Sequence, residues 1–337
     1  MNEREIMPRV SIKDIASRLG VSAAAVSLVL NNKEKNGRVS EVLAERIRAE
    51  AQTMNYEPNR FAKGLRSGRS ETIGLIVADI SNPFFAHLAF HIQEHAEKFG
   101  YSVIITNTNE KLDKMEKNIS ILKSRQVDGF IIVPTEHGEK QIEKLVREKY
   151  PVVLLDRCFK AIDVSYVVVN NYQVSMEATN LLLNMNCKRI AHITYKYKIP
   201  PMQDRKEGYI AAMTHRGLYD PKLIGEVDFW TMADEIPDIV MDLLSNDEKV
   251  DGFFFSSSSL AFNALKKMIA LKLEIPKDIK VVCFAKNDIF ELANYPIPYI
   301  QQPIPEIGKR AVELIIGHII QKDLPNVHEV LQAKLVF

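Results

Sequence analysis

The sequence predicts a small all-α helix-turn-helix headpiece followed by an α/β core of two lobes, each built on a doubly wound parallel sheet. Two short amphipathic segments joined by a tight turn open the chain, and from Thr72 onward short apolar runs alternate with amphipathic ones. Charge divides at the same point, because residues 1–70 hold 13 Lys and Arg against 8 Asp and Glu, whereas the remainder is slightly acidic. A basic head suggests a polyanionic partner for that part alone.

Composition excludes several classes of protein. With 337 residues, 46% hydrophobic and 26% charged, the chain is typical of a globular protein of two or three domains. Its apolar runs, such as Ile73–Val77, are far shorter than the ~18 residues that span a bilayer. The charged N-terminus lacks the apolar segment of an export signal, and three widely spaced cysteines do not suggest disulfides. We therefore expect a cytoplasmic protein without a membrane partner.

The first two helices are bounded by their own capping residues. Ser11 and Asp14 form a capping box, and Gly20 supplies a left-handed stop. Ser22 then caps a second helix, Ala23–Leu30, after a single intervening residue, which is the helix-turn-helix signature. The first helix carries one apolar stripe, formed by Ile12, Ile15, Ala16 and Leu19.

The second helix separates an inner from an outer face, and a third helix follows the Ser40 cap. We expect the inner faces to hold Val26, Val29 and Leu30 in the second helix and Leu43, Ile47, Ala51 and Met54 in the third. The outer face of the second helix carries Ala23, Ala24, Ser27, Leu28 and Asn31.

A short basic segment separates the headpiece from the core. Pro58 breaks the chain, and Asn59 can cap a helix that reaches Leu65. This helix is too short to be stable alone, and Gly64 weakens it by roughly 0.5–1 kcal/mol. We expect it to fold only on contact with a partner.

The core alternates strands with helices, which predicts parallel sheets with ligands at the carboxyl ends of the strands. The predicted strands are Thr72–Val77, Tyr101–Asn107, Gly129–Val133, Pro151–Leu155, Val167–Val169, Arg189–Thr194, Gly252–Ser256 and Lys280–Phe284. The predicted helices are Pro83–Phe99, Leu112–Arg125, Glu139–Lys149, Tyr172–Asn184, Gln203–Arg216, Ile236–Leu244, Ser258–Leu271 and Pro305–Gln321. Polar loops follow the strands, at 79–82, 107–110, 156–157, 170–171, 195–198, 256–259 and 285–288.

Seven stretches, in this order, resemble the LacI-type transcriptional regulators. They are Ser11–Asn31, Asn55–Leu65, Ile73–Phe85, Val127–Val133, Pro151–Arg157, Arg205–Tyr209 and Gln302–Leu314. The resemblance implies a core like that of periplasmic sugar-binding proteins. It also implies headpiece residues 1–58, a hinge at 59–70, a first lobe from 71–171 with 302–330, and a second from 172–301 with 331–337.

For DNA, the resemblance implies a homodimer on a near-palindromic operator, with the second helix in the major groove and the hinge helix in the minor groove. Leu65 matches the residue that wedges between base pairs, and Ala62 matches the small residue that lets the helix sit deep. The phosphate-binding positions match Ser11, Ser22, Ser27, Asn31, Ser40, Asn59 and Arg60.

Two features of the headpiece depart from the family. Ala23, Ala24 and Leu28 stand where relatives often carry polar base readers, and an arginine is usual at the last position. Losing that guanine contact costs ~1–3 kcal/mol at one base pair, so we expect a different operator. The loop from Lys33 to Arg38 is longer and more basic than usual, and we expect additional phosphate or minor-groove contacts from it.

For the cleft, the resemblance implies a carbohydrate-related effector as partner, and it implies no cofactor and no metal. The matching positions are Asp79, Asn82, Phe84, Phe85, Asp156, Asn170, Arg205, Ser257, Ser258 and Lys286. Acids usual in relatives are replaced at Asn170, Ser257-Ser258 and Ala285. Together with Arg205 and Lys286 this favours an anionic or amide-bearing ligand, unless the cleft has drifted and Lys286 points to solvent.

Other patterns have less specific interpretations. His87, His91 and His95 could hold a metal or form a pH-sensitive dimer contact, but an exposed helix face explains them as well. Ser256–Ser259 lacks a nucleophile elbow, and the glycines at 64 and 68 lack phosphate-loop spacing. We expect Phe229 and Trp230 to pack near an edge of the second lobe, with ligand contact as the alternative.

The sequence therefore predicts an effector-controlled, operator-binding regulator, interpreted as a repressor, that is not an enzyme. The alternative is a binding protein or enzyme that uses the two-lobed core without operator DNA. Neither the operator nor the effector follows from the sequence, nor does the choice between dimer and tetramer or between repression and activation.

Overall fold

The computed structural model describes residues 10–34, 39–56, 69–245, 249–286, 290, 295–321 and 323–337. These fall into two compact units, Met1–Ser70 and Glu71–Phe337. Several predicted DNA contacts lie outside the described residues, namely Lys35, Arg38, Asn59, Arg60, Ala62 and Leu65.

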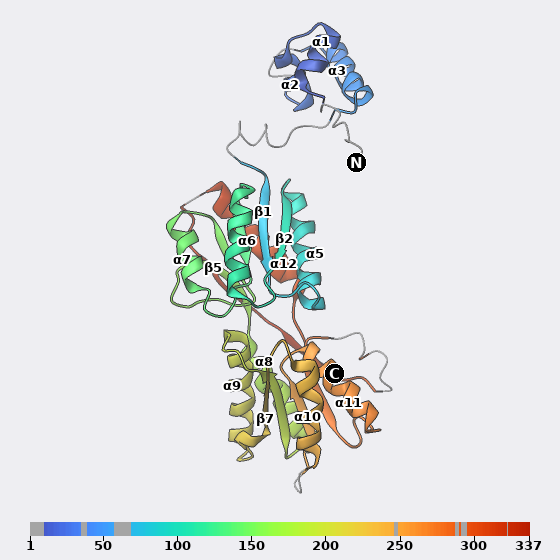
Figure 1. Cartoon of the computed structure of the whole chain (residues 1–337), viewed down its shortest axis with the longest axis vertical. Coiled ribbons are helices and arrows are strands. Elements are labelled where there is room, and N and C mark those ends of the chain that lie inside the picture. Colours follow the sequence, from blue (N-terminus) through green and yellow to red (C-terminus); the bar gives the residue numbers. More distant parts are fainter. Residues whose placement is uncertain are drawn as a thin grey trace, which may run out of the picture. The chain divides into compact units, whose positions relative to one another are not determined.

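The first unit contains three helices with the predicted caps: α1 (Ile12–Leu19), α2 (Ala23–Leu30) and α3 (Glu41–Thr53) (Figure 1). The Ser11 N–H donates to Asp14 Oδ2 over 2.7 Å, and the Asp14 N–H donates to Ser11 Oγ over 3.3 Å. Gly20 ends α1 with a φ of 66°, and Ser22 Oγ accepts the Ala25 N–H over 3.1 Å. The helix-turn-helix prediction is confirmed because these local hydrogen bonds set both ends of the turn.

A small apolar core joins the three helices. Its fully buried members are Ile15, Val26, Val29, Ala44 and Ile47. Leu30, Leu43 and Met54 pack against it while partly exposed. The inner faces predicted from helical spacing are therefore those that pack.

The second unit begins with a six-stranded parallel sheet in the order β11-β5-β4-β3-β1-β2. Its strands are β1 (Thr72–Val77), β2 (Ser102–Asn107), β3 (Gly129–Ile132), β4 (Val152–Leu155), β5 (Ser165–Val169) and β11 (His328–Leu331). Apolar residues of α5 (Pro83–Lys98) and α12 (Ile304–Ile320) pack on one face. Those of α6 (Leu112–Ser124) and α7 (Glu139–Arg147) pack on the other.

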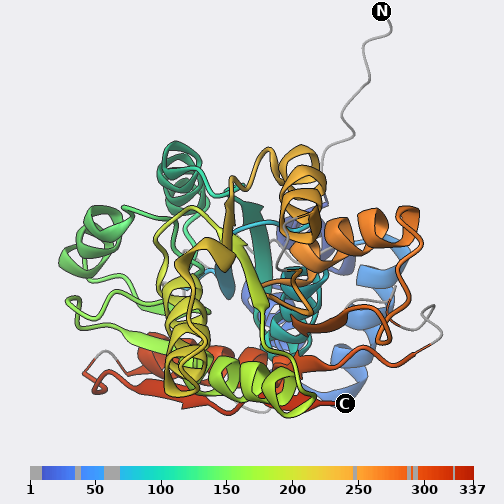
Figure 2. The ribbon, with the colours of Figure 1, turned by 90° about the horizontal axis from the view of Figure 1, so that it is seen from below.

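A second six-stranded sheet has the order β12-β10-β9-β8-β6-β7, with only β12 antiparallel. Its strands are β6 (Ile190–Tyr195), β7 (Ile224–Val227), β8 (Gly252–Phe255), β9 (Lys280–Phe284), β10 (Tyr299–Gln301) and β12 (Lys334–Val336). Helices α8 (Asn171–Asn184) and α9 (Pro200–His215) pack on one face. Helices α10 (Met232–Ser245) and α11 (Ser258–Ala270) pack on the other (Figure 2). Two doubly wound sheets confirm the predicted fold class.

The chain passes between the two sheets three times: at Asn170, at Gln302-Pro303 and at Gln332-Ala333. Asn170 ties the first and third passages together. Its Nδ2 donates to Gln332 Oε1 over 2.8 Å, and its Oδ1 accepts the Ala333 N–H over 2.8 Å. Within the described ranges, no helix is long and apolar enough to cross a membrane.

Candidate functional site

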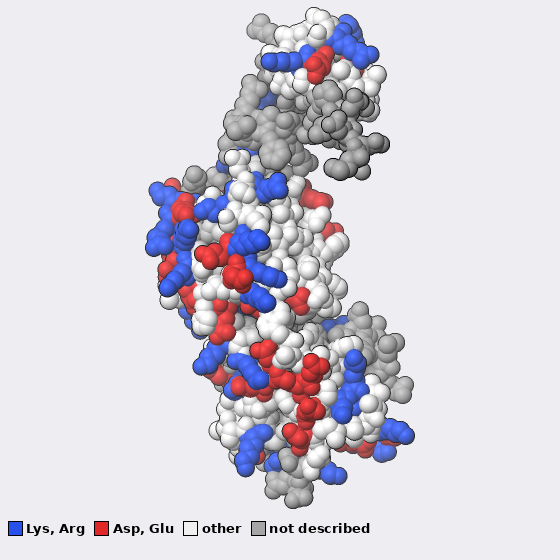
Figure 3. Space-filling view, viewed as in Figure 1, with Lys and Arg blue, Asp and Glu red and all other residues white. Residues whose placement is uncertain are grey.

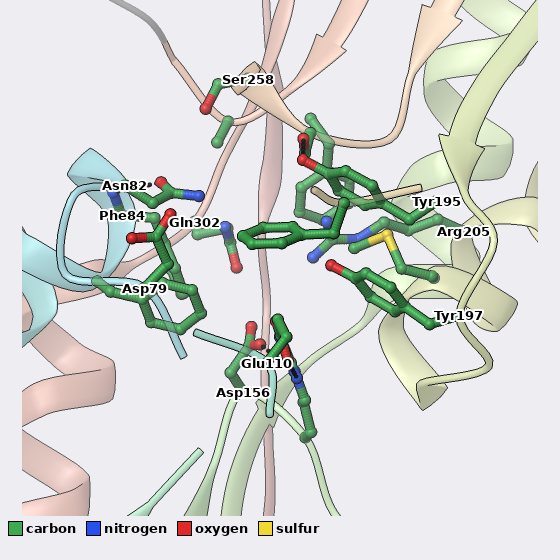
Figure 4. Close-up of a pocket in the computed structure, with 17 residues that line it drawn as sticks. Asp79, Asn82, Phe84, Glu110, Asp156, Tyr195, Tyr197, Arg205, Ser258 and Gln302 are labelled. Carbon is green, nitrogen blue, oxygen red and sulfur yellow. Dashed lines mark hydrogen bonds and ion pairs between the residues drawn. The ribbon is translucent and has the colours of Figure 1, made fainter. Parts of the chain in front are cut away.

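A pocket lies where the carboxyl ends of strands from both sheets face each other (Figure 4). Eight of the ten residues predicted for a ligand line it: Asp79, Asn82, Phe84, Phe85, Asp156, Arg205, Ser257 and Ser258. Ligands of doubly wound folds occupy this position, because strand-end loops and helix N-termini converge there.

The other two predicted residues do not line the pocket. The amide of Asn170 bonds to the passage at Gln332-Ala333, as described above, so its side chain is held between the two lobes. Lys286 follows β9 with an exposed side chain, whereas its neighbour Ala285 reaches the pocket. The position of a residue after a strand does not fix the direction of its side chain, and the exposure of Lys286 agrees with the solvent-facing alternative.

Nine further residues line the pocket: Glu110, Arg157, Tyr195, Tyr197, Met202, Phe229, Phe284, Ala285 and Gln302. Glu110, Arg157, Tyr195 and Tyr197 belong to strand-end loops identified in the sequence, so the signal for them was present. Phe229 packs against the apolar core of the second lobe and also lines the pocket, so both interpretations of it stay open. It follows β7, a strand that the sequence did not reveal.

The first lobe contributes a polar turn held by its own hydrogen bonds. Asp79 Oδ1 accepts from the Ser81 N–H and hydroxyl, at 3.0 and 2.7 Å. Asn82 caps α5, since its Oδ1 accepts the Phe84 N–H over 3.0 Å. The remaining polar atoms, Asp79 Oδ2 and Asn82 Nδ2, can therefore bind a ligand, and Figure 4 shows both side chains beside the cavity.

A buried ion pair forms the floor of the pocket. Arg157 Nη1 and Nη2 donate to the two carboxylate oxygens of Glu110 over 2.7 and 2.5 Å, and both side chains are less than 10% exposed. Burial opposes the charge of Arg157, but the Glu110 carboxylate outweighs burial and raises the pKa of the guanidinium. Burial raises the pKa of the neighbouring Asp156, and the charge of Arg157 only partly offsets this.

Arg205 is the fixed cation of the second lobe. Its Nε donates to Asn171 Oδ1 over 2.8 Å, and its Nη1 donates to the Ser256 carbonyl over 2.7 Å. The guanidinium lies 3.4 Å from the centre of the Phe284 ring. Burial lowers its pKa to about 10, so it remains charged at neutral pH. Within the described chain Nη2 has no hydrogen-bond partner, which leaves a donor for a ligand.

The second lobe also supplies aromatic faces and a buried acceptor. Tyr195 stacks on Tyr197 with ring centres 5.1 Å apart, and its hydroxyl lies 3.1 Å from Ser257 Oγ. Burial raises the pKa of Tyr195 to about 12, so the phenol stays protonated. Gln302, on an interlobe passage, is 8% exposed, and its Oε1 has no partner among the described atoms. A buried acceptor of this kind is satisfied by a donor from ordered water or from a bound molecule.

The two lobes touch around this pocket. Lys111 Nζ, from the first lobe, lies 4.8 Å from the centre of the Trp230 ring of the second. The Lys198 N–H donates to Glu136 Oε1 over 3.2 Å across the same cleft. The cavity measures about 60 Å³, which is small beside the ~300–1,000 Å³ of most ligand pockets.

The headpiece presents the predicted outer face of α2. Ala23, Ala24 and Asn31 are exposed, whereas Ser27 and Leu28 are partly exposed. The hydroxyls of Ser11, Ser22 and Ser40 each cap a helix, at N-termini suited to phosphate binding.

In the view of Figure 3, the core carries Lys and Arg side chains as well as Asp and Glu. There, acidic side chains gather over α10, which exposes Asp234, Asp238 and Asp242 (Figure 3). Negative charge of this kind repels a polyanion.

The histidines of α5 do not assemble a metal site. His91 Nδ1 lies 3.5 Å from Glu94, and His95 Nδ1 lies 3.0 Å from the His91 carbonyl. In the part of the chain that the structure describes, no group of three or more His, Cys, Asp or Glu side chains could hold a metal.

Comparison with known protein families assigns both units. Residues 70–332 match the periplasmic binding proteins and sugar-binding domain of the LacI family, and residues 11–59 match the bacterial regulatory proteins of that family. The chain belongs to the LacI family. As a LacI-family protein with the family's helix-turn-helix, it is a DNA-binding transcriptional regulator.

Individual relatives agree with this assignment along the whole chain. The ribose operon repressor of Halalkalibacterium halodurans is 33% identical over 97% of this chain and 95% of its own. That of Escherichia coli strain K12 is 29% identical over 93% and 94%. A lac repressor dimer bound to operator and an anti-inducer has the same fold, with a TM-score of 0.85 at 19% identity over 98% of each chain.

Proposed function

We propose that this LacI-family regulator acts as a repressor in the cytoplasm, bound to operator DNA as a homodimer. We further propose that a small neutral sugar in the pocket between its lobes controls that binding. The observation that carries the ligand assignment is the convergence of carboxylate, amide, phenol and guanidinium groups from both lobes on one pocket. Each sugar hydroxyl can donate to a carboxylate or to Gln302 Oε1 and accept from Arg205 or Asn82.

The balance of charge argues for a neutral ligand in place of the anionic or amide-bearing one expected from the sequence. That expectation depended on Lys286, which does not line the pocket, and on missing acids. Glu110 restores a carboxylate and neutralises Arg157. The described lining then holds three carboxyl groups, Asp79, Glu110 and Asp156, against two guanidinium groups, and Arg157 pairs with both Glu110 and Asp156, so an anion would gain little.

A pentose is the first candidate. Two relatives that match nearly the full chain are named ribose operon repressors, and a further structure 26% identical over 80% of this chain, with a TM-score of 0.72, is titled a putative ribose operon repressor. The aromatic faces of Tyr197 and Phe229 offer apolar surface for the C–H groups of a sugar ring, as stacking aromatics do at small-molecule sites.

The proposed control joins the two units. Ligand between the lobes favours one interlobe angle, and that angle sets the spacing of the two hinge segments of the dimer, residues 59–70 of each chain. Ala62 and Leu65 of the hinge would enter the minor groove, with Asn59 and Arg60 on phosphates. Headpiece contacts would come from the outer face of α2 and from the capping serines.

Calorimetric titration of the full-length chain tests the ligand. Ribose and other neutral pentoses should bind with release of heat, whereas ribose 5-phosphate and sugar acids should not bind detectably at the same concentrations. Binding of the sugar acids alone would contradict the neutral assignment and restore the anionic one.

We also infer that the pocket carries out no chemistry. Its described lining holds no histidine or cysteine, and the Glu110 carboxylate is paired with Arg157. Bound sugar should be recovered unchanged after prolonged incubation with the protein. A gel shift separates the remaining alternative, because truncation at Ser70 should abolish operator binding by a regulator but leave a mere sugar-binding protein unaffected.

A further inference from the structure

The outer face of α2 combines three apolar side chains with the polar Ser27 and Asn31. Ala23 and Ala24 are exposed at the start of α2, and Leu28 lies one turn later on the same side. None of the three side chains can donate or accept a hydrogen bond. These three side chains cannot distinguish base pairs by hydrogen bonding.

The polar side chains on or beside this face are either hydrogen-bonded to the backbone of α2 or too short to reach far into the groove. Asn31 Nδ2 donates to the Ser27 carbonyl over 2.7 Å, which holds the amide against its own helix. Ser22 Oγ accepts the Ala25 N–H. Ser27 has only a partly exposed hydroxyl, and hydroxyls bond to several bases alike. Hydrogen-bond readout from this face is therefore weak.

One feature of the major groove does suit an apolar face. The C5-methyl group of thymine projects into the groove and is recognised by apolar contact, whereas the other major-groove determinants are hydrogen-bonding groups. Small side chains at Ala23 and Ala24 also let the helix backbone approach the base edges closely. The core of the headpiece supports that position, because Val26 and Val29 anchor the opposite side of α2 at full burial.

We propose that Ala23, Ala24 and Leu28 read the operator through thymine methyl groups, so that the half-site positions facing α2 are A·T pairs. This specificity rests on the proposed operator binding. It differs from guanine recognition by an arginine at the position of Leu28.

Selection of bound duplexes from a random pool by the full-length chain provides the first test. The half-sites recovered should carry thymines at the positions facing α2. Conserved G·C pairs there would overturn the methyl readout while leaving operator binding intact. Recovery of no enriched sequence would contradict the proposed function itself.

The second test removes single methyl groups from the selected site. Replacing one thymine by deoxyuracil should weaken binding roughly fourfold at each contacted position, the factor expected when one methyl-sized group is no longer buried. The same replacement in flanking DNA should have no effect. Equal affinities for all uracil-containing duplexes would contradict the proposal.

Variants of α2 show which side chain contacts each thymine methyl group. In Leu28→Ala, the uracil penalty should disappear at one base pair only, and Leu28→Arg should shift the preference at that pair toward guanine. Gln52→Ala, an exposed substitution on α3, serves as the matched control and should retain every penalty. Circular dichroism of each variant checks that the headpiece is folded. If folded Leu28→Ala still lost affinity at every uracil position, Leu28 would not contact a thymine methyl group.

Discussion

Arg205 shows how a single residue can serve both the fold and the ligand. Two of its nitrogens satisfy Asn171 and the Ser256 carbonyl, its plane stacks on Phe284, and the third nitrogen faces the pocket. Only a planar fork of donors can make these contacts at once. A lysine keeps the charge but has no comparable geometry.

We therefore expect Arg205→Lys to weaken sugar binding by roughly 10- to 150-fold, the range for losing one hydrogen bond to a charged group. Calorimetry on the variant measures this, with Lys286→Ala as the control because Lys286 does not line the pocket. If the two variants bound sugar equally well, Arg205 would not be the anchor.

Asp156 provides a prediction that depends on pH. Burial raises the pKa of this carboxyl above its ordinary value of 3.8, so the folded state binds the proton more tightly than the unfolded state. Stability contributed by the protonated form is complete below that value and is lost as the pH rises through the folded pKa. Asp156 has a φ of 64°, which asparagine also tolerates.

The ordinary pKa of an aspartate is about 4. As the pH rises from about 3.5 to about 7, the free energy of unfolding of Asp156→Asn should therefore increase relative to that of the wild type. Urea unfolding of both proteins across this range measures the difference. A stability difference that is independent of pH would show that Asp156 ionises in the folded protein as it does in the unfolded chain.

At the scale of elements, α2 depends on its cap. Ser22 accepts the Ala25 N–H over 3.1 Å, and the helix has only eight residues. Ser22→Ala should lower the local stability of α2 by about 1 kcal/mol, with faster amide hydrogen exchange and weaker DNA binding. Ser17→Ala, an exposed serine inside α1, is the control. Matching exchange rates in the two variants would contradict a stabilising cap.

Local signals explain which elements the sequence reveals. The bounds of α1 and α2 are predictable because capping residues and a left-handed glycine specify them within a few positions. Strands β7, β10, β11 and β12 were not predicted. Each has three or four residues, and their partners are set by the tertiary fold, as for β11 beside β5.

The same distinction applies to the pocket. Residues in loops after recognisable strands, such as Asp79 and Asp156, could be predicted, because parallel strands bring their carboxyl ends together. Gln302 and Phe229 could not, since one lies on an interlobe passage and the other follows an unrecognised strand. The Asn170 amide is used to join two of the three passages of chain between the lobes, and no local sequence pattern indicates those passages.

At the scale of the whole core, two contacts between described residues join the lobes beside the pocket. Lys111 lies over the Trp230 ring, and the Lys198 N–H bonds to Glu136. Trp230 is the single tryptophan of the chain, so its fluorescence reports closure directly. Lys111→Met should raise the dissociation constant of the sugar about two- to fivefold, the range for an exposed cation–π pair. An unchanged constant, together with an unchanged emission spectrum, would exclude this contact from closure.

We propose that a sugar between the lobes controls a headpiece that recognises a specific operator. Fluorescence anisotropy of the full-length protein measures this control, with the selected duplex and a scrambled one at ~0.15 M salt. We predict at least ~10³-fold preference for the selected duplex, and a change of roughly 5- to 150-fold in that affinity on adding the sugar. Equal affinity for both duplexes, or a sugar that binds without altering either affinity, would contradict the account.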